Sequence, residues 1–413
     1  MSSLEPVKNQ EREIFMDVLR GFCILGIFIA NLNAFTWYDF VDPHTKGKFL
    51  IPGWDEKMQF LHHILIEGKF YSIFSFLFGW GIALQLKRAK SKKMRSSPLI
   101  RRRLTIMLFL GAFHLLIWPG DIIFFYALMG FVLLFFRKFS NKALLVTGIL
   151  FLLSPIVLYA LKMLFPVLNY PSSFMYKIGA NLDEKLIGVT SDETFKTYIR
   201  TANWWEILKG DLSGFFFRYG DLLFQSRIFK VLGMMLIGFV VGRSQFYKKI
   251  ADNRSVFYYI IFFGLFVGIP ANYVLATYMD NHDTSYAHFQ IDGLSRTIAY
   301  AIGVAPLAAT YIALFMLAYE NRKNRRYLEF LAPVGKMAFT NYVLQTLIGN
   351  FVFLNAGLGF MEKVGPVYYT LFAIIVFIFQ VIFSSVWLKN FNYGPLEWIW
   401  RSATYGQFQK FRK

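Results

Sequence analysis

The sequence predicts an all-α polytopic membrane protein with about ten transmembrane helices and both termini in the cytoplasm. Of its 413 residues, 56% are apolar and 19% are aromatic, but only 17% are charged. A soluble domain carries about a quarter charged residues, so this composition excludes an ordinary cytoplasmic enzyme. Apolar runs of about 20 residues, each long enough to cross a hydrocarbon core, recur along almost the whole chain.

The ten predicted spans follow from these apolar runs in chain order. A tight hairpin joins the third and fourth at Trp118-Pro119-Gly120-Asp121, where Pro and Gly end one helix and Asp121 can cap the next. The spans are expected at about 16–36, 64–86, 102–118, 121–137, 143–166, 223–242, 256–278, 296–318, 333–353 and 366–388.

The distribution of charge predicts the orientation of the spans. Residues 87–103 hold nine Lys or Arg and no acid, whereas residues 280–292 hold three Asp and no Lys or Arg. Basic loops mark the cytoplasmic side, so both termini are expected there, and the net charge of +19 requires no nucleic-acid partner. The other basic stretches are 137–142, 243–254, 322–326 and 411–413.

The chain is expected to form a single membrane domain over 1–413. The longest segment between spans, at about 169–222, would face outside, and residues 194–217 could lie on the membrane surface as an amphipathic helix. The only cysteine, Cys23, excludes internal disulfides and cysteine metal cages. We find no cleavable signal peptide, internal repeat or low-complexity tract.

Polar residues on the first helix are candidates for function, because ionisable groups at membrane depth are costly unless paired or hydrated. Fourteen residues at about 100° each bring Asn31 back to within about 40° of Asp17, so Asp17, Arg20 and Asn31 share a face. Asp17 and Arg20 could instead form a local pair near the helix end.

The third helix carries a second group of candidates. Residues 101–103 are three arginines at its cytoplasmic mouth, and His114 lies eleven residues beyond the last, on nearly the same side and roughly 16 Å away. A histidine can accept a proton near neutral pH, and Asp121 could fix its tautomer. Alternatively, His114 is a buried residue bonded to a backbone carbonyl, and the arginines only anchor the helix. The triplet is Arg101, Arg102 and Arg103.

Histidines near the outer ends of helices suggest weaker metal or proton sites. His63 and Glu67 are four residues apart and would face each other, although interfacial polar groups are more often simply solvated. We expect no bound metal. The residues concerned are His62, His63, Glu67 and Lys69, and in the outer loop His282, Asp283, His288 and Asp292.

The last candidates lie near the carboxyl end. Asn341 and Gln345 are one turn apart and could contact a substrate or join helices. Glu397 and Arg401, four residues apart, would pair if their segment is helical. The Trp residues beside them suit a membrane interface.

Five motifs occur in order along the chain: Asp17 with Arg20-Gly21, Phe74-Ser75-Phe76-Leu77-Phe78-Gly79, Gly111 to His114 with Gly120-Asp121, Thr340-Asn341-Tyr342, and Gly394-Pro395-Leu396-Glu397-Trp398. Together they resemble the bacterial YeiB-type membrane proteins, also described as domain-of-unknown-function family 418, and the resemblance spans nearly the whole chain. It implies a fold more readily than a reaction.

The first helix is similar, more distantly, to the acyltransferase-3 group and to the heparan-alpha-glucosaminide N-acetyltransferases. These move an acyl group from cytoplasmic coenzyme A to a sugar hydroxyl or amine. In the first group a helix-one Arg or Lys is followed, after ten intervening residues, by histidine; here Arg20 is followed by Asn31. The glucosaminide group has Asn there and a catalytic histidine on a later helix, for which His114 is the proposed counterpart.

Acyl transfer needs a base, a hydrogen-bond donor to the carbonyl oxygen and an anchor for the phosphates of the donor. His114 could supply the base, Asn31 or Asn341 the donor, and the arginine triplet the anchor. We therefore expect an acyltransferase of the bacterial inner membrane that uses acyl-coenzyme A as co-substrate and acts on an envelope glycan or small amphiphile.

Other functions stay open at this point. A proton-coupled transporter or lipid flippase could use Asp17, Arg20, Glu67 and His114 as its path, and a non-catalytic assembly or sensor protein is a third reading. Membrane lipids are expected partners, and the chain could form a homo-oligomer. Motifs for metalloproteases, Walker ATPases and serine esterases are absent from the sequence.

Overall fold

The computed structural model describes residues 13–91, 96–249, 253–280 and 286–413. Within these ranges the chain is helical, apart from turns and one isolated bridge between Phe391 and Arg412. The α-helices of the amino-terminal half are α1 (Ile14–Thr36), α2 (Pro43–Lys46), α3 (Pro52–Leu65), α4 (Lys69–Ser91), α5 (Ser96–Leu115), α6 (Ile123–Phe136), α7 (Asn141–Leu164), α8 (Tyr170–Ile187) and α9 (Asp192–Thr201). Those of the second half are α10 (Trp204–Phe224), α11 (Arg227–Ser244), α12 (Arg254–Phe263), α13 (Ile269–Asp280), α14 (Ile291–Glu320), α15 (Arg322–Leu328), α16 (Ala332–Lys336), α17 (Ala338–Phe353), α18 (Pro366–Asn390) and α19 (Pro395–Tyr405).

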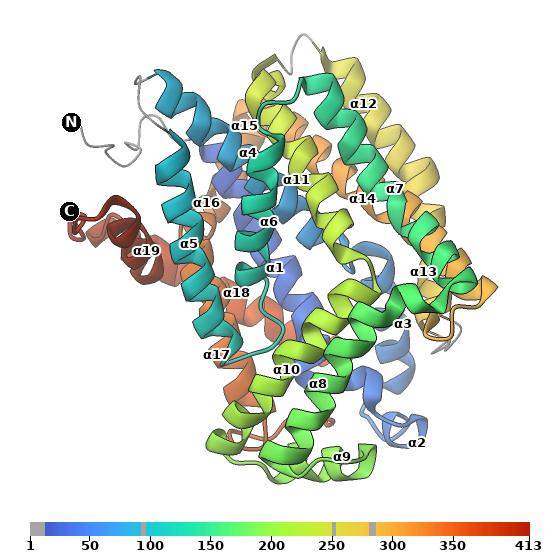
Figure 1. Cartoon of the computed structure of the whole chain (residues 1–413). Coiled ribbons are helices and arrows are strands. Elements are labelled where there is room, and N and C mark those ends of the chain that lie inside the picture. Colours follow the sequence, from blue (N-terminus) through green and yellow to red (C-terminus); the bar gives the residue numbers. More distant parts are fainter. Residues whose placement is uncertain (1–12, 92–95, 250–252, 281–285) are drawn as a thin grey trace.

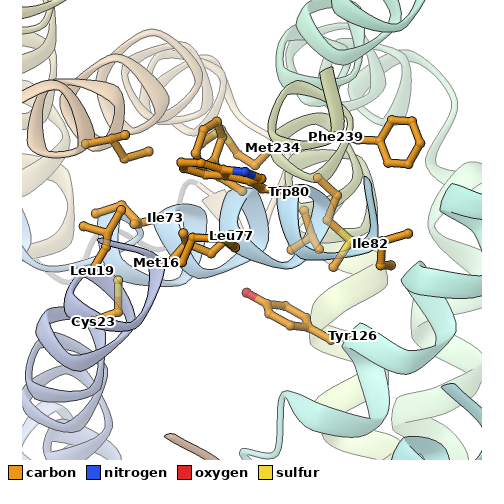
Figure 2. Close-up of a cluster of buried hydrophobic side chains, with 14 of the residues drawn as sticks. Met16, Leu19, Cys23, Ile73, Leu77, Trp80, Ile82, Tyr126, Met234 and Phe239 are labelled. Atoms are coloured by element: carbon orange, nitrogen blue, oxygen red, sulfur yellow. The ribbon is translucent and has the colours of Figure 1, made fainter. Parts of the chain in front are cut away.

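The core of the bundle lies where α1, α4, α6 and α11 meet (Figure 2). Trp80 of α4 is fully buried there, beside Met234 of α11. Two glycines let α4 and α11 approach closely: a Cβ on Gly79 would collide with the carbonyl oxygen of Met235, and one on Gly238 with that of Phe76. Small residues of this kind allow membrane helices to pack backbone against backbone.

The chain is a multi-pass membrane protein. Five helices in the described residues are long and apolar enough to cross a membrane, or six if the bent pair α10–α11 forms one span. Apolar side chains on α18 face outward, with Ile375 66% exposed, as expected for a helix in contact with lipid. Every one of the ten predicted segments contains a helix, but the count of ten and the cytoplasmic termini remain predictions.

The hairpin predicted at residues 118–121 is confirmed. α5 ends at Leu115, α6 begins at Ile123, and the carboxylate of Asp121 accepts a hydrogen bond from the Phe124 amide at 2.7 Å, which caps α6. The hairpin thus places Asp121 beside the last turn of α5.

Several boundaries differ from those predicted. The second span was placed at 64–86, but α3 ends at Leu65 and α4 begins at Lys69 after the left-handed Gly68. His63 and Glu67 therefore do not share one helix, and the prediction that they face each other across a helical turn is wrong. The segment 256–278 contains a π-helical stretch, Gly264–Gly268, between α12 and α13.

The segment predicted as an external loop forms a helical hairpin. α8 and α10 run side by side, with α9 at their far end (Figure 1). Ser172 donates a hydrogen bond to the Gly220 carbonyl at 2.8 Å, and Ser213 donates one to Asp183. The run 194–217 is divided between α9, which ends at Thr201, and α10, which Asn203 caps, so it is not one continuous helix. Its placement on the membrane surface stays a prediction.

Candidate functional site

A chain of three hydrogen-bonded side chains lies at the end of α5. His114 Nδ1 is 2.8 Å from Asp121 Oδ2, and His114 Nε2 is 3.0 Å from the hydroxyl of Thr346 on α17. An ionised carboxylate only accepts hydrogen bonds, so with Asp121 ionised Nδ1 donates to it and, in a neutral imidazole, Nε2 accepts from Thr346. The contact predicted between His114 and Asp121 is therefore present, and with Asp121 ionised it fixes the tautomer in which Nε2 carries the acceptor lone pair.

The surroundings of His114 are aromatic and polar. The imidazole centroid is 5.1 Å from that of Tyr342 and 6.4 Å from that of Trp118. His114, Asp121 and Thr346 are each at most 2% exposed. Both ring nitrogens have side-chain partners, so the alternative of a histidine held by a backbone carbonyl does not describe this site.

A cavity of about 180 Å³ approaches this group from the other end of α5. Residues of α1, α4, α5, α6, α16, α17 and α19 line it. Its walls are largely apolar and include Ile24, Ile27, Leu77, Leu104 and Met107. Two more lining residues lead to the histidine: Tyr342, which packs on His114, and Ile122, which follows Asp121 in the chain. The histidine therefore lies directly behind one wall of the cavity.

Basic side chains from four helices line the same cavity. Arg103 of α5 lies over the ring of Trp400, with its guanidinium carbon 4.1 Å from the ring centroid. Arg20 pairs with Asp17 at 2.9 Å between Nη1 and Oδ1. A cavity with apolar walls and several cations suits an amphiphile that has an anionic end. The four basic residues are Arg20, Arg103, Lys336 and Arg401.

The structure divides the predicted arginine triplet. Arg103 lines the cavity, whereas Arg101 and Arg102 are exposed and do not. Three successive residues of a helix point in directions about 100° apart, so one helix cannot turn all three toward one cavity. A role for Arg101 and Arg102 in holding phosphates therefore stays a prediction, and of the triplet only Arg103 lines the cavity.

On α1, helical spacing puts several predicted residues on one face. Arg20, Ile24 and Ile27 line the cavity, and Asn31 lies one further turn along the same face. Asn31 is half-buried and does not line the cavity. Asp17 does not line the cavity either, but it pairs with Arg20, which does. The local Asp17–Arg20 pair that the sequence left open is thus present.

Asn341 and Gln345 join helices. The Asn341 amide donates to the Ser384 hydroxyl at 2.9 Å, and that of Gln345 donates to the Gln380 side chain, also at 2.9 Å. The Gln380 side-chain amide in turn donates to the main-chain carbonyl of Asn341 at 2.9 Å. Neither Asn341 nor Gln345 lines the cavity. Their partners belong to α18, so the substrate role considered from the sequence is replaced by the helix-packing alternative.

This network gives a prediction on stability. We expect Gln380→Leu to lower the free energy of unfolding by about 1 kcal/mol, since interhelical hydrogen bonds in membranes contribute about that much. Thermal unfolding of the purified protein in detergent measures it, with ligand binding to the cavity expected to stay unchanged. A loss of binding with unchanged stability would contradict the packing role.

Glu397 holds two helices together. It lies on α19, so the segment is helical as the predicted pairing required, and its carboxylate accepts hydrogen bonds from the amides of Phe339 and Thr340 at 2.8 and 3.1 Å. These amides belong to the first turn of α17, where a negative charge is favourable. The guanidinium of Arg401 lies 4.8 Å from the ring centroid of Tyr393. Both residues line the cavity.

The histidines near the outer loops show no common site. His62 bonds through Nε2 with the Thr370 hydroxyl at 3.0 Å, and Lys69 donates to the His63 carbonyl at 2.8 Å. Among the described residues, no three His, Cys, Asp or Glu side chains are close enough together to hold a metal ion. Of the outer-loop set, His288 and Asp292 are exposed, while His282 and Asp283 lie outside the described residues.

Several residues of the site were not among the candidates from the sequence. Thr346 follows His114 by 232 residues, and its spacing carries no signal of their contact. Tyr342 lies in a motif that was noted only for its resemblance. A third group of cations could have been noticed in the sequence. These residues lie at or near the outer end of the predicted span 223–242, where the orientation rule disfavours positive charge; they are Arg218, Arg227 and Lys230.

Comparisons with known proteins give a family but no activity. A family model described as Protein of unknown function (DUF418) matches residues 241–407. The chain is 32% identical over 425 residues to the Uncharacterized protein YxaH of Bacillus subtilis (strain 168), covering 100% of this chain and 99% of that protein. It is 28% identical to the Uncharacterized protein YeiB of Escherichia coli (strain K12), covering 95% and 96%. No solved structure matches the chain.

Proposed function

We propose that this chain, which belongs to the YeiB-type DUF418 family, is an acyltransferase of the bacterial inner membrane. It moves an acyl group from cytoplasmic acyl-coenzyme A to a hydroxyl or amine of an envelope glycan or small amphiphile. The observation that carries the proposal is the hydrogen-bonded group of Asp121, His114 and Thr346 behind the wall of a cavity that basic side chains line.

The geometry around His114 supports its role as general base. Asp121 holds Nδ1, so Nε2 is left to accept a proton, and Nε2 already bonds a hydroxyl at 3.0 Å. In the proposed reaction the acceptor hydroxyl takes the place of the Thr346 hydroxyl. His114 removes its proton, the oxygen bonds to the thioester carbon, and the carbon–sulfur bond breaks. The thiolate leaves as the thiol with the proton from His114.

The cavity suits the donor. Its apolar walls can cover an acyl chain and the pantetheine arm, and its four basic residues can hold the phosphates by charge-assisted hydrogen bonds. Tyr342 stands between the cavity and the imidazole, so its side chain must turn for the thioester to reach Nε2.

Variants of the arginine triplet test the donor site. We expect Arg103→Gln to weaken the binding of acetyl-coenzyme A about tenfold, since a hydrogen bond to a charged group contributes about 1.5–3 kcal/mol. Arg101→Gln is the matched control, because Arg101 is exposed and does not line the cavity. Calorimetric titration measures both, and equal affinity in the two variants would argue against this donor site.

A transporter or lipid flippase is the second candidate, and one observation favours it. α10 and α11 meet at an angle of 71°, and interrupted helices are common at the binding sites of transporters. Proteoliposome uptake driven by a proton gradient, with no dependence on coenzyme A, would support this function. Acyl transfer by the purified protein would support the first.

A further inference from the structure

The junction between α10 and α11 is built around buried charge. α10 ends at Phe224 and α11 begins at Arg227, with Ser226 in the left-handed region at φ 52° (Figure 1). Lys162 of α7 donates hydrogen bonds to the carbonyls of Leu223 and Phe224 at 3.3 and 2.9 Å. A lysine thus caps the carboxyl end of α10 and stabilises the break.

More cations gather at this junction than the nearby carboxylates can balance. The charged groups that face Lys230 are Arg227, Arg296, Asp221 and Glu67, while Arg218 faces Arg227 and Asp221. Lys69, at the start of α4, is a further cation close to Glu67. Four basic side chains, from α10, α11 and α14, therefore share two carboxylates, Asp221 and Glu67, and Glu67 is also close to Lys69.

Several of these groups have unmet hydrogen-bonding capacity. The Nε atoms of Arg218 and Arg227 and the hydroxyl of Tyr219 are buried without a hydrogen-bond partner in the described chain. Lys230 is 8% exposed, and its Nζ lies over the ring of Tyr300, 3.7 Å from the centroid. Buried cations without an acceptor are costly, so such a group is expected to serve a ligand.

One guanidinium is already oriented. Arg227 donates to the Gln225 side-chain oxygen at 2.7 Å, and the Gln225 amide donates to Asp221, also at 2.7 Å. The face of Arg227 lies 5.3 Å from the ring centroid of Tyr71. A fixed arginine beside a lysine and a second arginine is a common arrangement for binding phosphate groups.

We infer that Arg218, Arg227, Lys230 and Arg296 form a binding site for a phosphate-type anion at the α10–α11 junction. The site is at the end of the bundle where the α8–α10 hairpin attaches, away from the predicted cytoplasmic loops. Cations at this end run against the orientation rule, which is explained if they bind an anion.

The anion site adjoins the histidine site. Tyr219, the residue next to Arg218, packs against Phe124 with ring centroids 5.9 Å apart, and the Phe124 amide donates a hydrogen bond to Asp121, the partner of His114. On the proposed function, the anion is the phosphate of the acceptor, whose hydroxyl or amine is then held near His114. This assignment rests on that function; the anion site itself does not.

Binding of two probes tests the site. Inorganic pyrophosphate and a short-chain phosphatidic acid are titrated into the purified protein in neutral detergent, without acyl-coenzyme A. We expect Arg218→Gln and Lys230→Met to weaken binding at least tenfold, and Lys185→Gln, an exposed lysine of α8, to leave it unchanged. Tighter binding of phosphatidic acid identifies a lipid headgroup; equal binding identifies a free phosphate group.

Thermal unfolding separates binding from a structural role. Without anion, Lys230→Met is expected to unfold at a higher temperature than the native protein, because it removes an unbalanced buried charge. If either variant fails to fold, Arg218→Lys, which keeps the charge and loses the planar donor, replaces it. Unchanged affinity in the folded variants, or a loss confined to Arg103→Gln in the cavity beside His114, would overturn the inference. Failure of acyl transfer alone would leave the anion site standing.

Discussion

We expect His114→Ala to lower the rate of the proposed acyl transfer by about 10²–10⁴-fold while the protein stays folded in the membrane. This is the contribution expected of a general base, and the geometry gives the reason: His114 Nε2 lies 3.0 Å from a hydroxyl while Nδ1 is held by a carboxylate. Transfer from labelled acetyl-coenzyme A to an envelope fraction measures the rate in purified protein.

Two further variants make this result specific. Asp121→Asn is expected to lower the rate less than His114→Ala, because the imidazole remains but its tautomer is no longer fixed. Thr346→Val keeps the shape of the site without its hydroxyl. We expect it to retain activity, because in the proposed reaction the acceptor hydroxyl replaces that of Thr346 at His114 Nε2. Full activity in folded His114→Ala would remove the histidine from the mechanism.

Gly79→Val prevents stable assembly of the bundle. A Cβ at this position would collide with the Met235 carbonyl oxygen, which is backbone of α11 and cannot move aside as a side chain would. Overpacking commonly costs about 1–3 kcal/mol and occasionally more, and here the collision falls in the core between α4 and α11.

The yield of monodisperse protein after detergent extraction, together with its thermal unfolding, measures the effect of Gly79→Val. Gly53→Ala is the control, since a Cβ on Gly53 of α3 has no atom within 4 Å. We expect that control to match the native protein or to exceed its stability slightly, because Ala favours helix over Gly. A native yield and stability for Gly79→Val would contradict the close packing of α4 and α11.

The features that the sequence predicted are those that depend on local pattern. Hydrophobic runs of spanning length located a helix in every predicted segment, and Pro119 and Gly120 located the α5–α6 turn with its Asp121 cap. His114 and Asp121 are seven residues apart in the sequence, and the hairpin between them brings their side chains together. Their contact could therefore be predicted from one short segment.

Features that depend on long-range packing escaped prediction. Thr346 reaches His114 only because the fold brings this turn of α17 to the end of α5, and Gln345, one residue earlier, bonds to α18. The α8–α10 hairpin was missed because its composition is mixed and its stability comes from contacts such as Ser172 with Gly220. Arg218 and Lys230 are far apart from Arg296 in sequence, and only the fold brings them together.

A structure with a non-hydrolysable acyl-coenzyme A bound tests the central claim most directly. The account predicts that its phosphates lie beside Arg103, Lys336 and Arg401 and that its thioether replaces the thioester near Tyr342 and His114 Nε2. A lipid filling the cavity while the coenzyme A analogue binds elsewhere, or nowhere, would contradict it.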